Sequence, residues 1–159
     1  MSIAAPFCGY EAVVKPEWID LNGHMNLAYY MVIFDHALDA ICSAWDLDWT
    51  YTKRTNHGTF AAETHTLYEQ ELLEGDRVRV ETWVVGADAK RVHVAQEIHR
   101  IADGARACCW EAVMLHVDLG SRRVVPFPPT QAAKVAAWAA AHAAAGLPGW
   151  IGRKVQMKR

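Results

Sequence analysis

Residues 20–45 read DLNGHMNLAYYMVIFDHALDAICSAW, a turn-forming segment followed directly by a long apolar repeat. The first seven residues are rich in Asp, Asn and Gly, which favour turns and helix N-caps. After them, apolar residues recur at intervals of three and four, as on one face of an α-helix: Tyr30, Ile33, Phe34, Ala37, Leu38, Ile41 and Trp45. This stripe predicts a helix from about Met25 to Trp45 at the centre of the core.

Strand-like segments lie on both sides of this helix in the sequence. A short strand is expected over residues 10–18, and a polar connector over residues 46–58. Further strands, separated by turn-forming residues, are expected over residues 59–72, 77–85, 92–98, 105–118 and 122–127. Three prolines then end the sheet, and a C-terminal helical extension is expected over about residues 129–146.

The order of these elements predicts the fold class. No helix separates the later strands, which excludes a parallel doubly wound sheet. A strongly curved antiparallel sheet wrapped around the long central helix satisfies the pattern, an α+β architecture. With 159 residues and no linker or repeat, the chain is predicted to form one domain, residues 1–159.

Composition and charge exclude several functions. The net charge of -2 and the pI near 6.4 provide no basic face, so a nucleic-acid partner is not expected. No uninterrupted apolar run approaches the roughly 18 residues of a membrane span, and residues 1–10 lack the pattern of a signal peptide. The four cysteines form no CxxC pair, which favours reduced thiols, no metal site and a cytoplasmic location.

The segment before the central helix also carries residues that could perform chemistry. Asp20, Asn22, His24 and Asn26 place a carboxylate, two amides and an imidazole within seven residues. The helix that follows adds unpaired backbone N–H groups and the positive end of its dipole. Thioester hydrolysis needs a carboxylate that attacks the carbonyl or activates water, and donors that hold the oxyanion. The same residue types also form ordinary turns and caps, so the pattern alone leaves a structural role open.

Residues 18–30, WIDLNGHMNLAYY, resemble the signature of hot-dog thioesterases of the 4-hydroxybenzoyl-CoA thioesterase type. The resemblance covers roughly residues 10–127 and implies a hot-dog fold with Asp20 as the catalytic carboxylate. The Asp-x-Asn-x-His spacing also resembles plant acyl-ACP thioesterases, which would make Asn22 and His24 catalytic as well. Residues 62–65, 86–93 and 115–118 resemble betainyl-CoA thioesterases of carnitine degradation, which occur alone or fused to carnitine dehydrogenase.

Two pairs of residues elsewhere in the chain are candidates for the same site. Glu63 and His65 share one face of their strand, because alternate residues point to the same side. Glu63 could supply a second catalytic carboxylate and His65 could bind substrate, although an ordinary polar strand face explains both. Lys90 and Arg91 lie beside a predicted turn and are suited to bind CoA phosphates, with a solvated pair at a hairpin end as the alternative.

Further substrate contacts are expected from Asn26 and Tyr30, at the start of the helix. The chain also has seven tryptophans, many for its length. Trp18, Trp83 and Trp110 could attract the quaternary ammonium of a betainyl group through their aromatic faces. Packing in the core explains most of these tryptophans equally well.

These features and the resemblance predict an acyl-CoA thioesterase that acts on a small acyl-CoA, with betainyl-CoA as a candidate substrate. CoA would arrive as part of the substrate, with no separate cofactor or metal. The family resemblance implies that sheets pair edge to edge, giving a homodimer or a dimer of dimers with sites at the subunit interface.

Two alternatives remain at this point. An enoyl-CoA hydratase is disfavoured, because that family has one more residue before the histidine than the Gly23-His24 pair allows. A non-catalytic acyl-CoA-binding protein is disfavoured, because it would need no carboxylate at Asp20.

Overall fold

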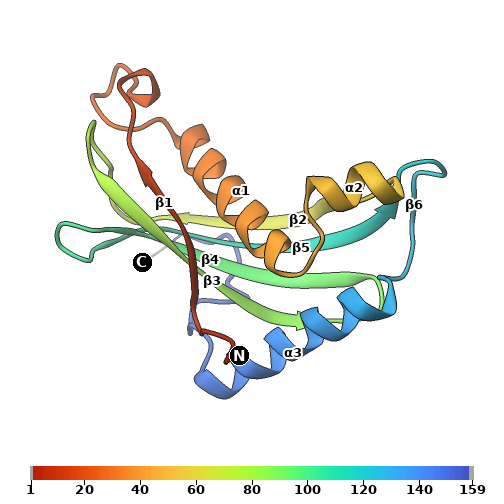
Figure 1. Cartoon of the computed structure of the whole chain (residues 1–159). Helices are drawn as coiled ribbons and strands as arrows, with labels where there is room; N and C mark the ends of the chain where they lie inside the picture. The colour runs from red at the N-terminus through yellow and green to blue at the C-terminus, as the bar shows by residue number, and fades with distance from the viewer. Residues whose placement is uncertain (1, 158–159) are drawn as a thin grey trace.

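A curved antiparallel sheet packs one face against a long helix in the computed structural model, which describes residues 2–157 (Figure 1). The elements are β1 (Phe7–Val13), the short 3-10 helix η1 (Pro16–Trp18), α1 (Leu27–Ala44), α2 (Trp49–Thr55), β2 (His57–Tyr68), β3 (Arg77–Ala87), β4 (Arg91–Arg100), β5 (Arg106–Asp118), β6 (Arg123–Val124) and α3 (Pro129–Ala145). The strand order is β1-β3-β4-β5-β2, and β6 pairs with the end of β5. All the pairings are antiparallel, which confirms the predicted hot-dog architecture.

The apolar stripe of α1 forms the centre of the core. Ile33, Phe34 and Ile41 are fully buried between the helix and the sheet. The ring of Phe34 stacks on Trp110 of β5 with centroids 5.6 Å apart. Because Trp110 therefore faces α1, strict alternation places its neighbour Glu111 on the opposite, outer face of the sheet.

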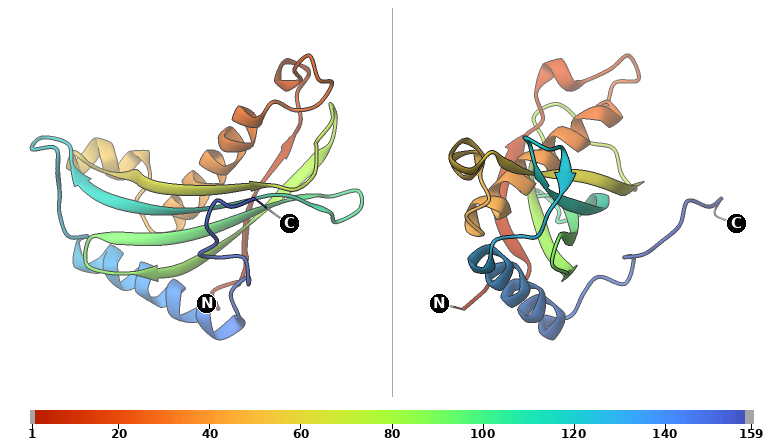
Figure 2. Two further views of the ribbon diagram at one scale, coloured as in Figure 1. Left: turned by 180° about the vertical axis from the view of Figure 1, so that it is seen from behind. Right: turned by 90° about the vertical axis from the view of Figure 1, so that its right-hand side faces the viewer.

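The two edges of the sheet differ. β1 covers β3 only as far as the Phe7–Thr82 pair, and α3 packs along the rest of β3 (Figure 1). At the opposite edge, β2 pairs only with β5, so its other side is free of any described strand. The C-terminal segment crosses the outer face (Figure 2), where Trp150 Nε1 donates to Glu97 Oε1 at 2.6 Å.

Several predicted boundaries were wrong, among them the end of the strand expected over residues 59–72, which is Tyr68. The connector over residues 46–58 contains α2, and the final strand of the sheet shrinks to the two residues of β6. The first strand begins at Phe7 and ends at Val13, because Pro16 starts the 3-10 helix that follows. The central helix begins two residues later than expected, at Leu27.

By length and mean hydropathy alone, α1 could cross a membrane. Its fully buried residues pack against the sheet, as the core helix of a globular domain does. No other helix of the described residues meets these criteria of length and hydropathy.

Candidate active site

The loop before α1 is closed on itself by backbone hydrogen bonds. The Asp20 N–H donates to the His24 carbonyl at 3.1 Å, and the Gly23 N–H donates to the Asp20 carbonyl at 3.0 Å. Gly23 adopts a φ of 81°, a left-handed conformation that glycine reaches without steric cost. Ile19 and Met25 form a β-bridge at the base. The backbone around Asp20 is thus a tight, hydrogen-bonded turn.

The Asp20 carboxylate is held in its ionised form. The Asn22 N–H donates to Oδ1 at 2.7 Å, and Asn26 Nδ2 donates to Oδ2 at 3.2 Å. These bonds lower the pKa of Asp20, with the Asn22 backbone the largest cause, and they outweigh partial burial, which acts in the opposite direction. Of the predicted site residues, the structure brings Asp20, Asn22 and Asn26 directly together.

Asn26 joins this carboxylate to the helix. Its Oδ1 accepts from the Ala28 N–H at 3.1 Å, which caps α1, while its Nδ2 contacts Asp20. The Tyr29 N–H donates to the Asn26 carbonyl. The N–H of Leu27, the first residue of α1, has no acceptor within residues 2–157. A negative charge developing beside Asp20 would therefore meet a free N–H at the positive end of the helix dipole.

Two of the predicted residues near this loop have looser or different contacts. His24 is half-buried, with Nδ1 4.0 Å from Glu71 Oε2. Tyr30 is buried, and its hydroxyl donates to the Gln70 carbonyl at 3.2 Å and accepts from the Leu72 N–H at 3.1 Å. Burial raises the pKa of Tyr30 to about 12. Tyr30 thus anchors α1 to the segment after β2 through its hydroxyl, and its contact with substrate stays a prediction.

Glu63 and His65 lie away from this loop, on the outer face of the sheet. Residue His65 pairs with Glu111 of β5, whose carboxylate lies 2.8 Å from His93 Nε2. Together these side chains line a small pocket of about 300 Å³ that the C-terminal segment borders at Gly152. His65 Nδ1 is buried there without a partner among the described residues. The two residues do share one face, as predicted, but that face is not the one that carries α1.

The turn between β3 and β4 lies at the other end of the sheet (Figure 1); Lys90 is in this turn and Arg91 begins β4. Both backbone N–H groups donate to Asp88 Oδ1, and Arg91 Nε donates to Asp88 Oδ2 at 2.7 Å. The Arg91 hydrogen bond and the backbone N–H groups lower the pKa of Asp88 to about 2. Within one chain, the predicted residues therefore occupy three separate places.

A cavity of about 750 Å³ lies between α1 and the β2 side of the sheet. It begins at Ala28, beside the Asn26 cap, and continues past the end of α1 to Trp49. Its walls are Ala28, Met31, Val32, Asp35, Leu38, Asp39, Cys42, Leu47, Asp48, Trp49, Thr52, Gly58, Thr59, Phe60, Ala61, Thr64, Trp110, Met114 and Leu119. Because its wall includes Ala28, in the first turn of α1, the cavity reaches the end of the helix that carries the Asn26 cap.

The three tryptophans considered for a cation site do not meet in one place. Trp110 lines the cavity, whereas Trp18 stacks on Tyr29 beside the Asp20 loop and Trp83 is buried in β3. Trp49 and the acidic residues of the cavity wall were not among the predicted site residues. Their signal was present, since Asp35 and Asp39 are four residues apart in an otherwise apolar helix and so share one side of it.

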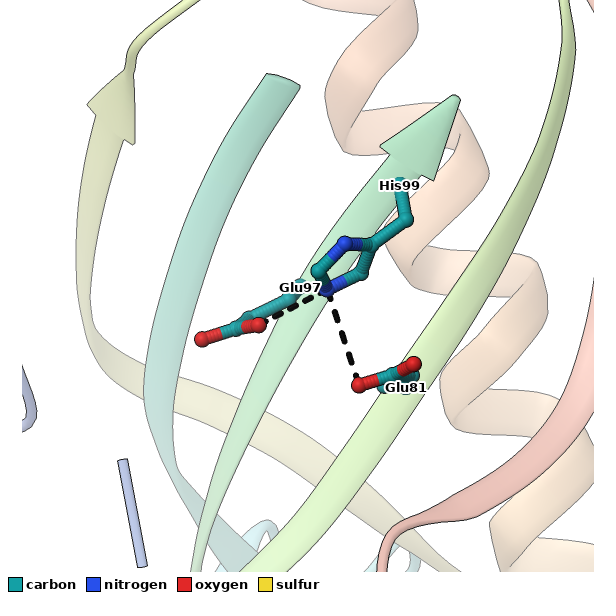
Figure 3. A group of neighbouring side chains, drawn as sticks. All are labelled: Glu81, Glu97 and His99. Carbon is teal, nitrogen blue, oxygen red and sulfur yellow. Dashed lines mark hydrogen bonds and ion pairs between the residues drawn. The ribbon is translucent and has the colours of Figure 1, made fainter. Parts of the chain in front are cut away.

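A second cluster of ionisable groups lies on the outer face (Figure 3). His99 Nε2 is 2.8 Å from Glu97 Oε2 and 3.6 Å from Glu81 Oε2. Three such groups could in principle hold a metal ion. However, Glu97 also accepts from Arg106 at 2.9 Å, and Glu81 accepts from Arg79 at 2.9 Å. The two carboxylates are thus compensated by arginines, and this arrangement is a network of ion pairs.

Comparisons with known proteins agree on one family. A family profile described as the Thioesterase-like superfamily matches residues 14–135. The chain is 36% identical over 146 residues, 92% of each chain, to a betainyl-CoA thioesterase of Pseudomonas aeruginosa. It is 30% identical, over its whole length and 32% of the other chain, to an L-carnitine dehydrogenase/betainyl-CoA thioesterase of Rhizobium meliloti. The chain thus spans about a third of that fused protein.

Solved structures share the fold over nearly the whole chain. A Staphylococcus aureus protein solved in complex with CoA superposes with a TM-score of 0.87 at 24% identity, covering 99% of this chain and 100% of that one. A Pseudomonas putida KT2440 protein, provisionally assigned as a thioesterase, superposes with a TM-score of 0.82 at 28% identity. The match covers 98% of this chain and 99% of that one.

Proposed function

The chain belongs to the thioesterase-like superfamily, and from that membership we propose that it hydrolyses a small acyl-CoA, betainyl-CoA first, through Asp20. It is an enzyme of the acyl-CoA thioesterase class with a hot-dog fold. One observation carries the assignment of the site. The Asp20 carboxylate is kept ionised by Asn22 and Asn26 at the N-terminus of the central helix.

The proposed reaction uses the groups of this loop. The Asp20 carboxylate either attacks the thioester carbonyl or takes a proton from the attacking water. The charge that develops on the carbonyl oxygen is held by the free Leu27 N–H and the helix dipole. The C–S bond then breaks and the CoA thiolate takes up a proton. On the route in which Asp20 attacks the carbonyl, a water molecule next hydrolyses the mixed anhydride that has formed. On both routes the free acid leaves and the Asp20 carboxylate is restored. Asn26 positions the carboxylate, and His24 orients water or substrate.

A second copy of the chain would complete the site. Phe60 and Tyr68, both well exposed, lie eight residues apart on the free edge of β2. A two-fold axis near Thr64 would place the Phe60 end of each strand beside the Tyr68 end of the other. Tyr68 lies at the Asp20 end, because its hydroxyl donates to the Leu27 carbonyl at 3.4 Å.

The same axis would bring the CoA-binding candidates across the interface. Arg91 pairs with Leu115, which pairs with Phe60, so Lys90 and Arg91 belong to the Phe60 end. In a symmetric dimer they would approach the Asp20 loop of the other subunit. We therefore assign Asp20 from one subunit and Lys90 and Arg91 from its partner to the same active site. The proposed location is the cytoplasm, since the described cysteines are all free thiols.

The test is hydrolysis of betainyl-CoA, followed through the loss of thioester absorbance so that the exposed thiol of Cys8 does not interfere. Asp20→Asn should lower kcat by about 100- to 10,000-fold. Asp46→Asn is the matched control, because that exposed carboxylate lies beyond the C-terminal end of α1, away from the Asp20 loop, and pairs with Lys134. Wild-type turnover in Asp20→Asn would refute the proposed role of the carboxylate, and no turnover of any acyl-CoA would refute the function.

A further inference from the structure

The cavity beside α1 carries three carboxylates without a cationic partner. Asp35 and Asp39 project from α1, and Asp48 precedes α2. Among the described residues none of the three forms an ion pair within 4.0 Å, whereas Asp88 and Asp103 each pair with an arginine. Asp48 accepts from the Tyr51 N–H, and Asp35 and Asp39 have no hydrogen-bond donor within residues 2–157.

No positive charge from the described chain compensates this wall. None of the cavity-lining residues is lysine, arginine or histidine. The nearby cations of α2, Lys53 and Arg54, are exposed, and the Arg54 guanidinium lies over the Tyr51 ring at 6.0 Å. The pKa of Cys42, in the cavity wall, is raised to about 12, chiefly by burial and next by the charge of Asp39. The negative charges of Asp35, Asp39 and Asp48 all raise the pKa of this thiol, so their electrostatic effect reaches the cavity wall.

Aromatic faces complete the lining. Trp49 and Phe60 are partly exposed at its rim, and Trp110 is buried in its wall. The indole Nε1 of Trp110 has no hydrogen-bond partner among the described residues, although it is buried. Buried polar groups are normally satisfied, so this unpaired donor calls for an acceptor, which an uncharged part of a bound ligand would supply. Aromatic rings and carboxylates together attract quaternary ammonium groups.

We propose that this cavity binds the acyl group of the substrate and that Asp35 and Asp39 select acyl groups carrying a quaternary ammonium. The inference rests on the proposed function, and it names the substrate class and the residues that recognise it. The aromatic rings of Trp110 and Trp49 line the cavity at different depths, and the two carboxylates supply the compensating charge.

The position of the carboxylates also predicts a dependence on acyl length. Asp35 lies seven residues beyond Ala28, about 10 Å along the helix axis, and Asp39 lies about 6 Å further. In a betainyl group the cation is two bonds from the carbonyl carbon. It therefore does not contact these carboxylates and experiences only their longer-range electrostatic attraction. A 4-trimethylammoniobutanoyl group carries its cation two bonds deeper. The carboxylates should therefore act more strongly on the longer acyl group.

The test compares two pairs of substrates that differ only in charge. Betainyl-CoA is matched with 3,3-dimethylbutanoyl-CoA, and 4-trimethylammoniobutanoyl-CoA with 5,5-dimethylhexanoyl-CoA, because a quaternary carbon replaces the quaternary nitrogen. In the wild-type protein, kcat/KM should favour each cationic member by about tenfold or more. Equal hydrolysis of the charged and neutral members would overturn the proposal while leaving the thioesterase function intact.

Variants then locate the selectivity. Asp35→Asn and Asp39→Asn should each reduce the cationic-to-neutral ratio of kcat/KM by about three- to tenfold, more for the longer pair, with little change for the neutral substrates. Asp46→Asn is the matched control, since this carboxylate lies outside the cavity and pairs with Lys134. An unchanged ratio in Asp35→Asn and Asp39→Asn would overturn the assignment of these residues.

A binding measurement separates this proposal from the proposed catalysis. In calorimetric titrations choline should bind about tenfold or more tightly than its neutral isostere 3,3-dimethylbutan-1-ol, and the preference should shrink in Asp35→Asn/Asp39→Asn. This result requires no turnover, so it holds even for a chain that hydrolyses no acyl-CoA. Absence of any preference for choline would overturn the cation site directly.

Discussion

The imidazole of His142 on α3 accepts a hydrogen bond from the backbone N–H of Val84 on β3, with Nδ1 2.9 Å from the nitrogen. The other ring nitrogen, Nε2, lies 3.0 Å from the Ala4 carbonyl. Since β1 stops pairing with β3 at Thr82, this imidazole takes the place of a neighbouring strand at the uncovered edge. Both bonds together require a neutral ring with its proton on Nε2. One buried side chain thus ties α3, β3 and the N-terminal segment together.

Removing this imidazole should weaken the fold without touching the active site. In His142→Phe, which keeps the ring volume, the Val84 N–H loses its acceptor, and an unsatisfied buried donor costs about 1–3 kcal/mol. Urea unfolding should show this loss in the free energy of unfolding at neutral pH. Replacement of the exposed His36 by Phe is the control and should change stability little. Equal stability of His142→Phe and wild type would contradict the role assigned to the hydrogen bond.

The same contact predicts how stability depends on pH. Burial lowers the pKa of His142, and also that of His116, below the ordinary value of 6.5. When the pH falls below this value, the unfolded chain takes up protons that the folded chain excludes, so the free energy of unfolding decreases. The stabilisation is complete above pH 6.5 and is lost as the pH falls through the lower folded pKa. In His142→Phe the decrease should be smaller but not absent, because His116 remains.

The sequence predicted the elements whose patterns are long and missed those whose patterns are short. The stripe from Tyr30 to Trp45 predicted α1, because one face of a long helix must be buried. α2 escaped notice, since only Tyr51 of its seven residues is buried and the helix depends on the Asp48 cap. Pro16 could have indicated the 3-10 helix η1, because proline is favoured in the first turn of a helix.

The site could be predicted where its residues are close in sequence. Asp20 and Asn26 are six residues apart, and local turn chemistry brings them together. Glu63 could not be placed, because alternation indicates which residues share a face but not which face it is. Here an irregularity between Ala61 and Glu63 reverses the alternation, so that Ala61 lines the cavity and Glu63 points outward. The relation of Arg91 to Asp20 depends on how chains assemble, which periodicity does not encode.

Asn26 should influence the pH profile of the reaction as well as its rate. Asn26→Ser retains a side-chain oxygen that can cap α1 but removes the amide Nδ2 that donates to Asp20. Since that hydrogen bond lowers the pKa of Asp20, its loss should move the acidic limb of the kcat/KM profile to higher pH. At neutral pH kcat should fall by about three- to tenfold, because the carboxylate is less well positioned. A purely structural role for Asn26 would lower stability and leave the acidic limb in place.

Gly23 should be needed for the geometry of the Asp20 turn. A Cβ at this position would meet no atom within 4 Å, so Gly23→Ala creates no clash. Its φ of 81° nevertheless costs a residue with a side chain about 1–2 kcal/mol. Stability and kcat should both fall. Gly86→Ala is the control, since a Cβ is equally unobstructed there and the backbone is not left-handed. Equal activity in the two variants would show that the turn tolerates the substitution.

The shared active site predicts that two defective chains restore each other. Asp20→Asn should lose the carboxylate, and the double variant Lys90→Ala/Arg91→Ala should bind CoA phosphates weakly and lose activity at low substrate concentration. If each site takes Asp20 from one subunit and the basic pair from its partner, a mixed dimer contains one intact site. After co-refolding of equal amounts, about a quarter of wild-type activity should return, because half of the dimers are mixed and half of their sites are intact.

The opposite arrangement gives a different result in the same experiment. If Asp20 and the basic pair of one chain served the same site, every site of a mixed dimer would carry one of the two defects. Activity would then stay at the mean of the two variants measured separately. Light scattering on the mixture distinguishes this outcome from a failure to assemble. Recovery therefore decides between a site built within one chain, whose Asp20 and Arg91 lie at opposite ends of the sheet, and one built across two.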